Sequence, residues 1–226
     1  AFGIPLQFEK TYTEGISGIS LADISFAEEL GYRIKHLGIA RKTARGVEMR
    51  VHPTLVPSTS LLANVNGVGN AVMVQGNFVG STLYSGPGAG AEATASAVVA
   101  DLIDLARDRL AGVKAPVRPA LGSTQTGSSL DVLPIEQIEV GYYLKIPVLD
   151  KLGVMAKLSA VLQQRGISIE AIIQKESENS ETVPVVILTQ VVREQELNAA
   201  LDALAELDEV TGPVTRIRIE PFDGEA

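Results

Sequence analysis

The alternation of hydrophobic and polar positions predicts a well-defined C-terminal half. From Tyr142 to Val148 apolar residues occupy every second position, which is typical of a strand with one buried face. Residues 154–162 then repeat at helical spacing, and Gly166 ends that helix. The remaining predicted elements are strands over 167–173, 183–191 and 214–219 and a second helix over 197–204. The order βαββαβ predicts a ferredoxin-like fold, one antiparallel sheet with two helices on one face.

The N-terminal half predicts an antiparallel sheet with helices on one side. Residues 4–13 indicate a strand, and Ser20 to Asp23 has the form of a capping box that opens a helix ending at Gly31. Two β-rich runs, 32–41 and 47–56, predict a hairpin. Short strands continue from residue 61 to 90, separated by the turn-forming pairs Asn66-Gly67, Gly69-Asn70 and Gly76-Asn77. A helix over 93–109 is expected to close this sheet.

The periodic signal fades between the two halves. Residues 113–139 are rich in proline, glycine and serine and have too few regularly spaced apolar positions for an element, so they predict a linker. We therefore expect an α+β chain with a first unit over 1–112 and a second unit over 140–222.

Composition excludes several classes of function. With 226 residues, 46% of them hydrophobic, the chain can bury a sizeable core. Its net charge of −8 and the absence of a Lys/Arg-rich run argue against a nucleic-acid partner. There is no cysteine, which excludes disulfides and thiolate chemistry, and His36 and His52 are too few for a histidine-rich metal site. No apolar run reaches the roughly 20 residues of a membrane helix, so we expect a soluble chain without a membrane partner.

The glycine-rich loop Gly86-Pro87-Gly88-Ala89-Gly90 lies between a predicted strand and the long helix. Its glycines let the backbone approach another group closely, and the first helical turn offers unpaired N–H groups and a partial positive charge. A phosphate or an amide would suit such a site. The alternative interpretation is a tight turn packed on the sheet, because the spacing matches neither the dinucleotide nor the P-loop motif.

Several motifs of the first unit resemble the homoserine dehydrogenase family. They are Thr13-Glu14-Gly15-Ile16, Ala22-Asp23, Glu29-Leu30-Gly31-Tyr32, His52-Pro53, Asn64-Val65-Asn66-Gly67, Asn70-Ala71-Val72 and the run from Tyr84 to Gly90, followed by Thr94-Ala95 and Asp101. Three positions depart from the family's usual residues: Gly69 replaces an apolar residue, Asn77-Phe78 replaces Asp-Ala, and Ala93 replaces proline.

The resemblance implies a cytoplasmic oxidoreductase that interconverts L-homoserine and L-aspartate 4-semialdehyde with NAD(P). In the family, a nucleotide-binding half and a helix with the catalytic aspartate and lysine come before this region, and the sequence shows neither. The chain also begins Ala1-Phe2-Gly3 without methionine. We therefore expect a fragment that is inactive alone and has no catalytic residue. Gly86, Gly88, Ala89 and Gly90 are expected to contact the cofactor in the complete enzyme, and the fragment alone is expected not to bind it.

The second unit resembles an ACT domain, an amino-acid-sensing module. Asp150-Lys151-Leu152-Gly153-Val154 resembles the turn between the first strand and first helix of that family, although Leu152 replaces its frequent proline, and Gly166-Ile167-Ser168-Ile169 resembles the following strand. The resemblance implies an amino-acid effector, threonine by analogy, at Asp150, Leu152, Gly153 and Val154. Gln174 either completes the site from a neighbouring subunit of a dimer or tetramer or is a solvated strand end, and of these the solvated strand end is the simpler interpretation. Asp150 either accepts the effector's ammonium group or caps the helix.

Some polar residues have simpler interpretations. Glu14 either lines the floor of an active site or accepts backbone N–H bonds, and we expect the second. Asp23 is interpreted as a helix-start carboxylate, and Asn64, Asn66 and Asn70 as turn residues. A different class of function also fits the sequence, an ACT-containing module for oligomerisation or interaction without any ligand.

Overall fold

The computed structural model describes residues 7–113, 130–174 and 181–220. These residues fall into two compact units. The described part of one unit is residues 64–113, and that of the other is residues 7–63 together with 130–174 and 181–220. Within these residues, no helix has the combination of length and apolar character needed to cross a membrane.

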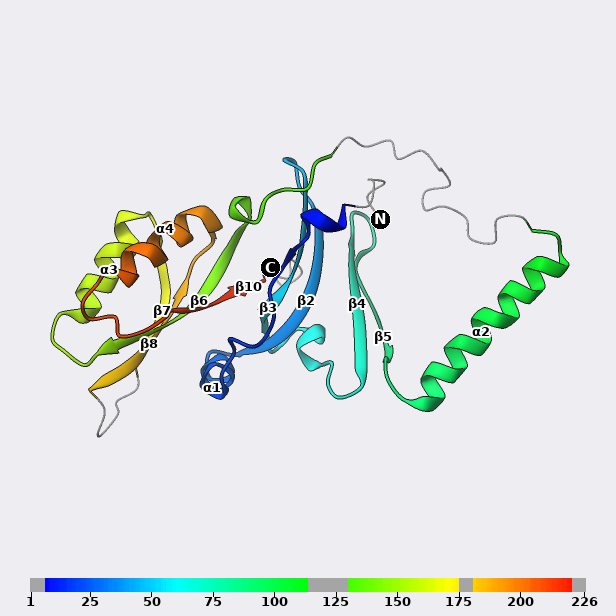
Figure 1. Cartoon of the computed structure of the whole chain (residues 1–226), viewed down its shortest axis with the longest axis horizontal. Helices are drawn as coiled ribbons and strands as arrows, with labels where there is room; N and C mark the ends of the chain where they lie inside the picture. The colour runs from blue at the N-terminus through cyan, green and yellow to red at the C-terminus, as the bar shows by residue number, and fades with distance from the viewer. Residues whose placement is uncertain (1–6, 114–129, 175–180, 221–226) are drawn as a thin grey trace. The chain divides into compact units, whose positions relative to one another are not determined.

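The larger unit is built on an eight-stranded sheet with the order β1-β3-β10-β6-β8-β7, in which β2 pairs with β3 and β9 with β6 (Figure 1). Its strands are β1 Tyr12–Thr13, β2 Tyr32–Lys42, β3 Val47–Pro57, β6 Glu139–Leu149, β7 Ile169–Gln174, β8 Thr182–Thr189, β9 Val192–Arg193 and β10 Thr215–Ile219. Its helices are α1 Leu21–Glu29, α3 Val154–Gln164 and α4 Glu194–Ala205, with short 3₁₀ turns at Phe8–Lys10, Leu61–Asn64 and Ile135–Gln137.

Local sequence signals explain the first elements. The Ser20 side chain accepts a bond from the Asp23 backbone N–H while the Asp23 carboxylate accepts from the Ser20 N–H, so the predicted capping box opens α1. Gly31, with φ of 82°, follows the end of that helix as predicted. The predicted hairpin is also confirmed as β2 and β3. The strand predicted over 4–13 is wrong, because its described part forms a 3₁₀ turn and the two-residue β1.

The C-terminal elements have the predicted ferredoxin-like arrangement. Strands β10, β6, β8 and β7 are neighbours in that order and all pair antiparallel. Helices α3 and α4 lie on one face of this sheet (Figure 1). The apolar side chains of that face form one core with the two helices, including Tyr142, Leu144, Leu158 and Leu197.

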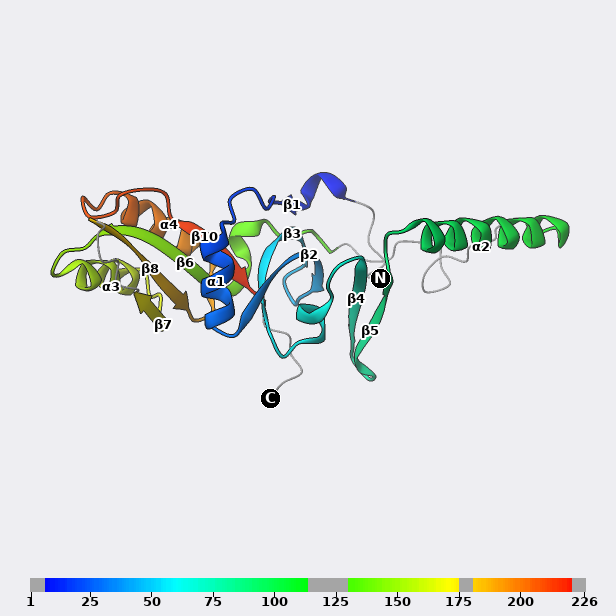
Figure 2. The ribbon, with the colours of Figure 1, turned by 90° about the horizontal axis from the view of Figure 1, so that it is seen from below.

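A second core covers the opposite face of the same sheet. It contains Phe26 and Ala27 of α1, Leu55 of β3 and Tyr143 of β6, and Figure 2 shows α1 beside these strands. Alternate residues of β6 therefore enter two different cores. A sheet buried on both faces needs no solvent-exposed polar side, which explains why Tyr143 is as buried as Tyr142.

The compact units do not follow the predicted division of the chain. β3 pairs with β10 in parallel through Arg218↔Thr54 and Ile219↔Leu55, so one sheet contains strands from both predicted units. Residues 130–139 of the predicted linker belong to the same unit, since Val132 bridges Val47 and Ile138 is buried. Residues 114–129 of that linker lie outside the described part. The local pattern of hydrophobic and polar residues does not indicate pairing between strands that are so distant in sequence.

The smaller unit contains β4 Gly69–Gly76, β5 Gly80–Pro87 and α2 Ala91–Leu110. The two strands pair antiparallel, as predicted for this stretch, although Gly69-Asn70 begins a strand instead of forming a turn. The long helix α2 is also confirmed. It buries no residue, however, so the predicted closure of a sheet by this helix does not occur in the described residues.

Candidate functional site

The glycine-rich loop joins β5 to α2. β5 ends at Pro87, and Gly90 is the N-cap of α2 with φ of 120°. A side chain at this φ is strained, which explains the glycine. No side chain caps this helix. The first N–H groups of α2 therefore remain available to a bound group, and the loop residues themselves are exposed.

Gly88 is required by a close approach within the smaller unit. Its backbone N–H donates to the Val68 carbonyl at 2.7 Å, and a Cβ at this position would lie 1.1 Å from Nδ2 of Asn70. Asn70 therefore occupies the space beside the loop, whereas Asn66 makes a local bond to the Asn64 carbonyl at 3.2 Å. The loop thus combines open positions at Gly86 and Gly90 with one that is packed.

The chemistry of the loop suits one end of a nucleotide cofactor. It presents backbone N–H groups and a positive helix end, which favour an amide or a phosphate, and it lacks an ionisable side chain. The backbone groups of Gly86, Gly88, Ala89 and Gly90 therefore fit a contact with such a cofactor. They supply no group that transfers a proton.

The predicted effector residues surround the start of α3. Gly153 is the N-cap with φ of 87°, and a Cβ there would meet no atom within 4 Å. Leu152 is fully exposed, whereas Val154 is buried in the core. Asp150 is exposed and provides no side-chain cap to α3, so the capping interpretation of this carboxylate is wrong. A polar ligand can therefore approach the backbone at Gly153 directly.

Gln174 is the last residue of β7, which forms one edge of the large sheet. It is exposed and pairs across the sheet with Val185. Among the described residues, no strand pairs with the outer side of β7, and a second chain can pair with such an edge.

Glu14 belongs to an ion-pair network that sequence patterns did not reveal. Its Oε2 accepts from the Tyr12 hydroxyl at 2.7 Å and from Nη1 of Arg218 at 2.9 Å. Burial raises the pKa of Glu14, but the hydrogen bonds from Arg218 and Tyr12 and the charge of Arg218 outweigh it and hold the pKa below its usual value. The carboxylate is thus bound by side chains, and the expected backbone N–H bonds to it are absent among the described residues.

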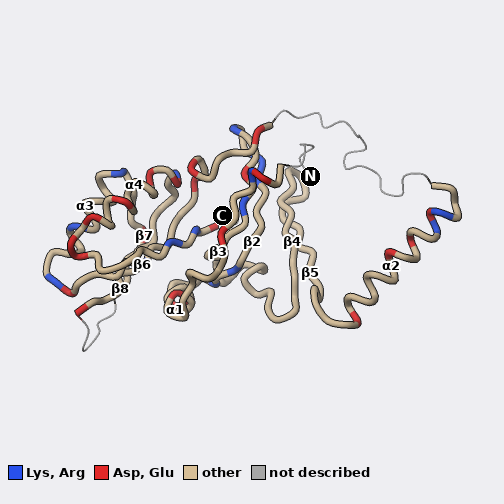
Figure 3. Tube along the Cα trace, in the orientation of Figure 1, with Lys and Arg blue, Asp and Glu red and all other residues tan. Residues whose placement is uncertain are grey.

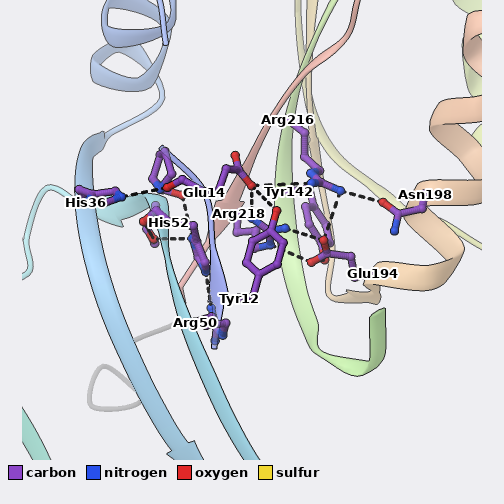
Figure 4. A network of polar contacts seen from close by, with 12 residues as sticks. Tyr12, Glu14, His36, Arg50, His52, Tyr142, Glu194, Asn198, Arg216 and Arg218 are labelled. Atoms are coloured by element: carbon purple, nitrogen blue, oxygen red, sulfur yellow. Dashed lines mark hydrogen bonds and ion pairs between the residues drawn. The ribbon is translucent and has the colours of Figure 1, made fainter. Parts of the chain in front are cut away.

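The network continues into the C-terminal elements (Figure 4). Arg218 of β10 donates through Nε to Glu194 of α4 at 2.7 Å, and the Tyr142 hydroxyl donates to the same carboxylate at 3.1 Å. Arg216 donates to Asn198 at 2.7 Å. The signal available in the sequence was the alternation of Arg216 and Arg218 with isoleucines in a strand, because buried arginines need acidic partners.

A second buried cluster surrounds His52. Arg50 donates to Glu48 and Glu220 at 3.1 and 2.9 Å, and its Nη1 lies 3.0 Å from Nε2 of His52. Burial, together with the charge of Arg218, lowers the pKa of His52 to about 3. His52 therefore stays neutral, with Nδ1 donating to the Pro53 carbonyl at 2.9 Å and Nε2 accepting. Within the described residues, no group of three or more histidines and carboxylates is placed to bind a metal.

Two protein families match this chain, one in its N-terminal part and one in its C-terminal part. Residues 1–103 match the family described as homoserine dehydrogenase, and residues 142–209 match the ACT domain family. A homoserine dehydrogenase of Pseudomonas aeruginosa is 54% identical over 99% of this chain and 52% of its own length. A homoserine dehydrogenase of Neisseria gonorrhoeae is 48% identical over 97% of this chain and 51% of its own length.

A solved structure gives the same result. The crystal structure of a homoserine dehydrogenase from Thiobacillus denitrificans superposes with a TM-score of 0.84 at 46% identity, covering 98% of this chain and 50% of that one. The chain thus spans about half the length of the relatives that it matches. On these matches, this chain belongs to the homoserine dehydrogenase family and combines a segment of its catalytic region with an ACT domain.

Proposed function

We propose that this chain forms part of a cytoplasmic, NAD(P)-dependent homoserine dehydrogenase that interconverts L-homoserine and L-aspartate 4-semialdehyde. Such an enzyme serves the biosynthesis of threonine, methionine and isoleucine. The observation that carries the proposal is the Gly86–Gly90 loop, which opens α2 inside the segment matched to the family. The exposed loop and the uncapped helix start support a contact with the cofactor.

The proposal assigns binding, and no proton transfer, to the residues of this chain. NAD(P), when bound, supplies the hydride chemistry. Gly86, Gly88, Ala89 and Gly90 hold one polar end of the cofactor by backbone contacts, and Glu14 is kept ionised by Arg218. The sequence contains no glycine-rich dinucleotide fingerprint. The 226-residue chain alone is therefore expected to give no turnover with homoserine and NAD(P).

A hybrid enzyme tests this function. The chain replaces the corresponding half of the Pseudomonas aeruginosa relative, with which it shares 54% identity. The hybrid should oxidise homoserine, and its Gly90→Val variant should show a raised KM for NAD(P), because the side chain strains the loop at φ of 120°. A folded hybrid without activity, or a KM for NAD(P) that Gly90→Val leaves unchanged, would contradict the proposal.

The ACT domain is proposed to sense an end-product amino acid, threonine first. The match to the ACT family and the open backbone at Gly153 support this role. Calorimetry of the chain with threonine, isoleucine, serine and methionine tests it. Heat with one of them identifies the effector, and absence of heat with all four at millimolar concentration removes the sensing role.

One observation favours the second candidate function, an assembly module without a ligand. Apolar side chains of α2 are exposed, including Val98, Val99, Leu102 and Leu105, as are Val72 and Tyr84 of the β4–β5 pair. A group of exposed apolar side chains such as this one is typical of a surface that another chain covers. Self-association combined with no amino-acid binding would favour this second function.

A further inference from the structure

A cleft of about 350 Å³ lies in the larger unit, and none of its lining residues belongs to the Gly86–Gly90 loop or to the start of α3. It is formed by the segment 14–19, by Leu201 of α4 and by residues 214–216 at the start of β10. Its volume is within the range of about 300–1,000 Å³ that is usual for small-molecule sites. The segment belongs to the region matched to homoserine dehydrogenase, and α4 belongs to the matched ACT domain.

Two opposite charges border this cleft. The Glu14 side chain is 29% exposed and that of Arg216 is 20% exposed. Their atoms Oε2 and Nη2 are 3.8 Å apart, which is too long for a hydrogen bond. Arg216 directs its other nitrogen, Nη1, to Asn198 and Glu194, as Figure 4 shows. Nη2 therefore keeps hydrogen-bonding capacity on the open side.

The second oxygen of Glu14 is also free. Every side-chain bond or ion pair of Glu14 in the described residues goes to Oε2. Among the described residues, no buried side-chain oxygen or nitrogen lacks a hydrogen-bond partner. Since Oε1 of Glu14 has no such partner, it is not buried and is accessible to solvent. Arg218 and Tyr12 hold the carboxylate in place and ionised. The cleft thus offers a fixed acceptor for a cation beside a donor for an anion.

The remaining wall selects the rest of the ligand. Ile19, Leu201 and Val214 supply a partly buried apolar surface. Gly15 and Gly18 line the cleft without side chains, and a Cβ at either would meet no atom within 4 Å. A ligand that satisfies all these groups carries an ammonium group, a carboxylate and a short apolar side chain. A phosphate would meet repulsion from Glu14, so the carboxylate disfavours simple anions.

We propose that this cleft binds a free aliphatic α-amino acid, with its ammonium group on Glu14, its carboxylate on Arg216 and its side chain against Ile19, Leu201 and Val214. The site is separate from the one proposed at Gly153 and does not depend on dehydrogenase activity. Its occupant touches the segment after β1 and the elements α4 and β10 together. Binding there therefore stabilises one arrangement of these parts.

The first experiment uses the unmodified 226-residue chain. NMR of its methyl groups is recorded during titration with valine, isoleucine, leucine and threonine, and then with their N-acetyl and amide derivatives. The methyl signals of Ile19 and Val214 should shift with a free amino acid and should not shift with either derivative, because each derivative removes one charge. Equal shifts with the derivatives, or no shift up to tens of millimolar, would overturn the proposal. Displacement by inorganic phosphate would overturn it as well.

Two variants locate the binding by calorimetry. Gly18→Leu fills the cleft at a position without positive φ, and Arg216→Met removes the partner of the carboxylate. Each should weaken binding by about tenfold or more. Gly38→Leu, in β2 of the same unit, is the matched glycine control, because Gly38 has no positive φ, a Cβ there would meet no atom nearer than 3.9 Å, and the residue does not line the cleft. This variant should bind as the wild type does. If Gly153→Val abolishes binding while Gly18→Leu retains it, the ligand belongs to the start of α3 and the proposal is wrong.

Discussion

Asp23 and Lys145 form an ion pair in which Nζ lies 2.8 Å from the carboxylate. Asp23 is completely buried, and its other contacts are the Ser20 cap and the Tyr143 hydroxyl at 3.0 Å. One carboxylate therefore starts α1 and attaches this helix to the central strand of the ACT sheet. The sequence predicted the first of these roles, and the second depends on a partner 122 residues away.

Asp23→Ala should destabilise the larger unit strongly. The substitution removes the cap, leaves the Tyr143 hydroxyl without its acceptor and leaves Lys145 with only the Ser20 hydroxyl. Breaking a buried pair costs about 3–5 kcal/mol. Denaturant unfolding followed by circular dichroism measures this loss. Asp202→Ala, on the exposed side of α4, is the matched control and should change the free energy of unfolding by less than about 0.5 kcal/mol. Equal effects of the two variants would show that the buried pair contributes nothing.

The pH dependence of stability should report His52. Its pKa of about 3 in the folded protein lies below the ordinary value of 6.5, chiefly because of burial. The unfolded chain then binds more protons than the folded one between these values, so stability is complete above pH 6.5 and falls as the pH is lowered. A single such group contributes a slope of about 1.4 kcal/mol per pH unit.

This slope is measured best between pH 6.5 and 5, where most carboxylates remain ionised. His52→Gln should lose most of it, because glutamine does not titrate. His36→Gln retains His52 and with it the slope. A wild type whose free energy of unfolding is constant over this interval would disprove the assignment of a neutral, buried His52.

Local patterns predicted most elements because their causes are local. Capping at Ser20, the alternation in β6 and the ends at Gly31 and Gly166 each depend on a few consecutive residues. The ferredoxin-like order followed from these elements. The sequence also predicted the glycine-rich loop and the open turn at Gly153, since both require conformations that glycine favours.

The long-range features were missed because no local pattern encodes them. The parallel pairing of β3 with β10 joins residues 54 and 55 to residues 218 and 219. The network of Glu14, Arg218 and Glu194 depends on the same pairing. The alternation in β6 predicted one buried face, and Tyr143 on the other face is also buried because α1 covers that face. Sequence spacing fixes which residues share a face, but not what covers it.

The exposed apolar residues of α2 should support self-association. No charged residue lies between Glu92 and Asp101 in the sequence of α2, and Figure 3 shows a stretch of this helix without charge. The apolar residues Val98, Val99 and Leu102 are each at least 52% exposed. A second copy of the chain would remove them from water. The wild type should therefore sediment as a dimer or larger species at micromolar concentration, and Val99→Glu with Leu102→Glu should yield a monomer.

A control distinguishes this effect from a change in net charge. Asp104→Ala with Asp108→Ala changes charge on the same helix without adding charge to its apolar stretch, and this variant should still associate. Analytical ultracentrifugation of all three proteins decides the matter. A monomeric wild type would remove α2 as an assembly surface and with it the support for the second candidate function.

The start of α3 gives the sharpest test of the proposed ACT effector site, because two neighbouring residues contribute in different ways. Gly153 has φ of 87° and open space around it, so Gly153→Val strains the turn by about 1–3 kcal/mol and blocks close approach to the backbone. Asp150 is exposed and caps nothing, so Asp150→Ala should leave the unfolding transition unchanged. It should nevertheless weaken binding of an effector's ammonium group by about 1.5–3 kcal/mol, the value of a charged hydrogen bond. Calorimetry with threonine and thermal unfolding of both variants separate the two effects. Unchanged affinity in Asp150→Ala would exclude this carboxylate from the effector site, and a stable Gly153→Val with normal affinity would exclude the whole turn.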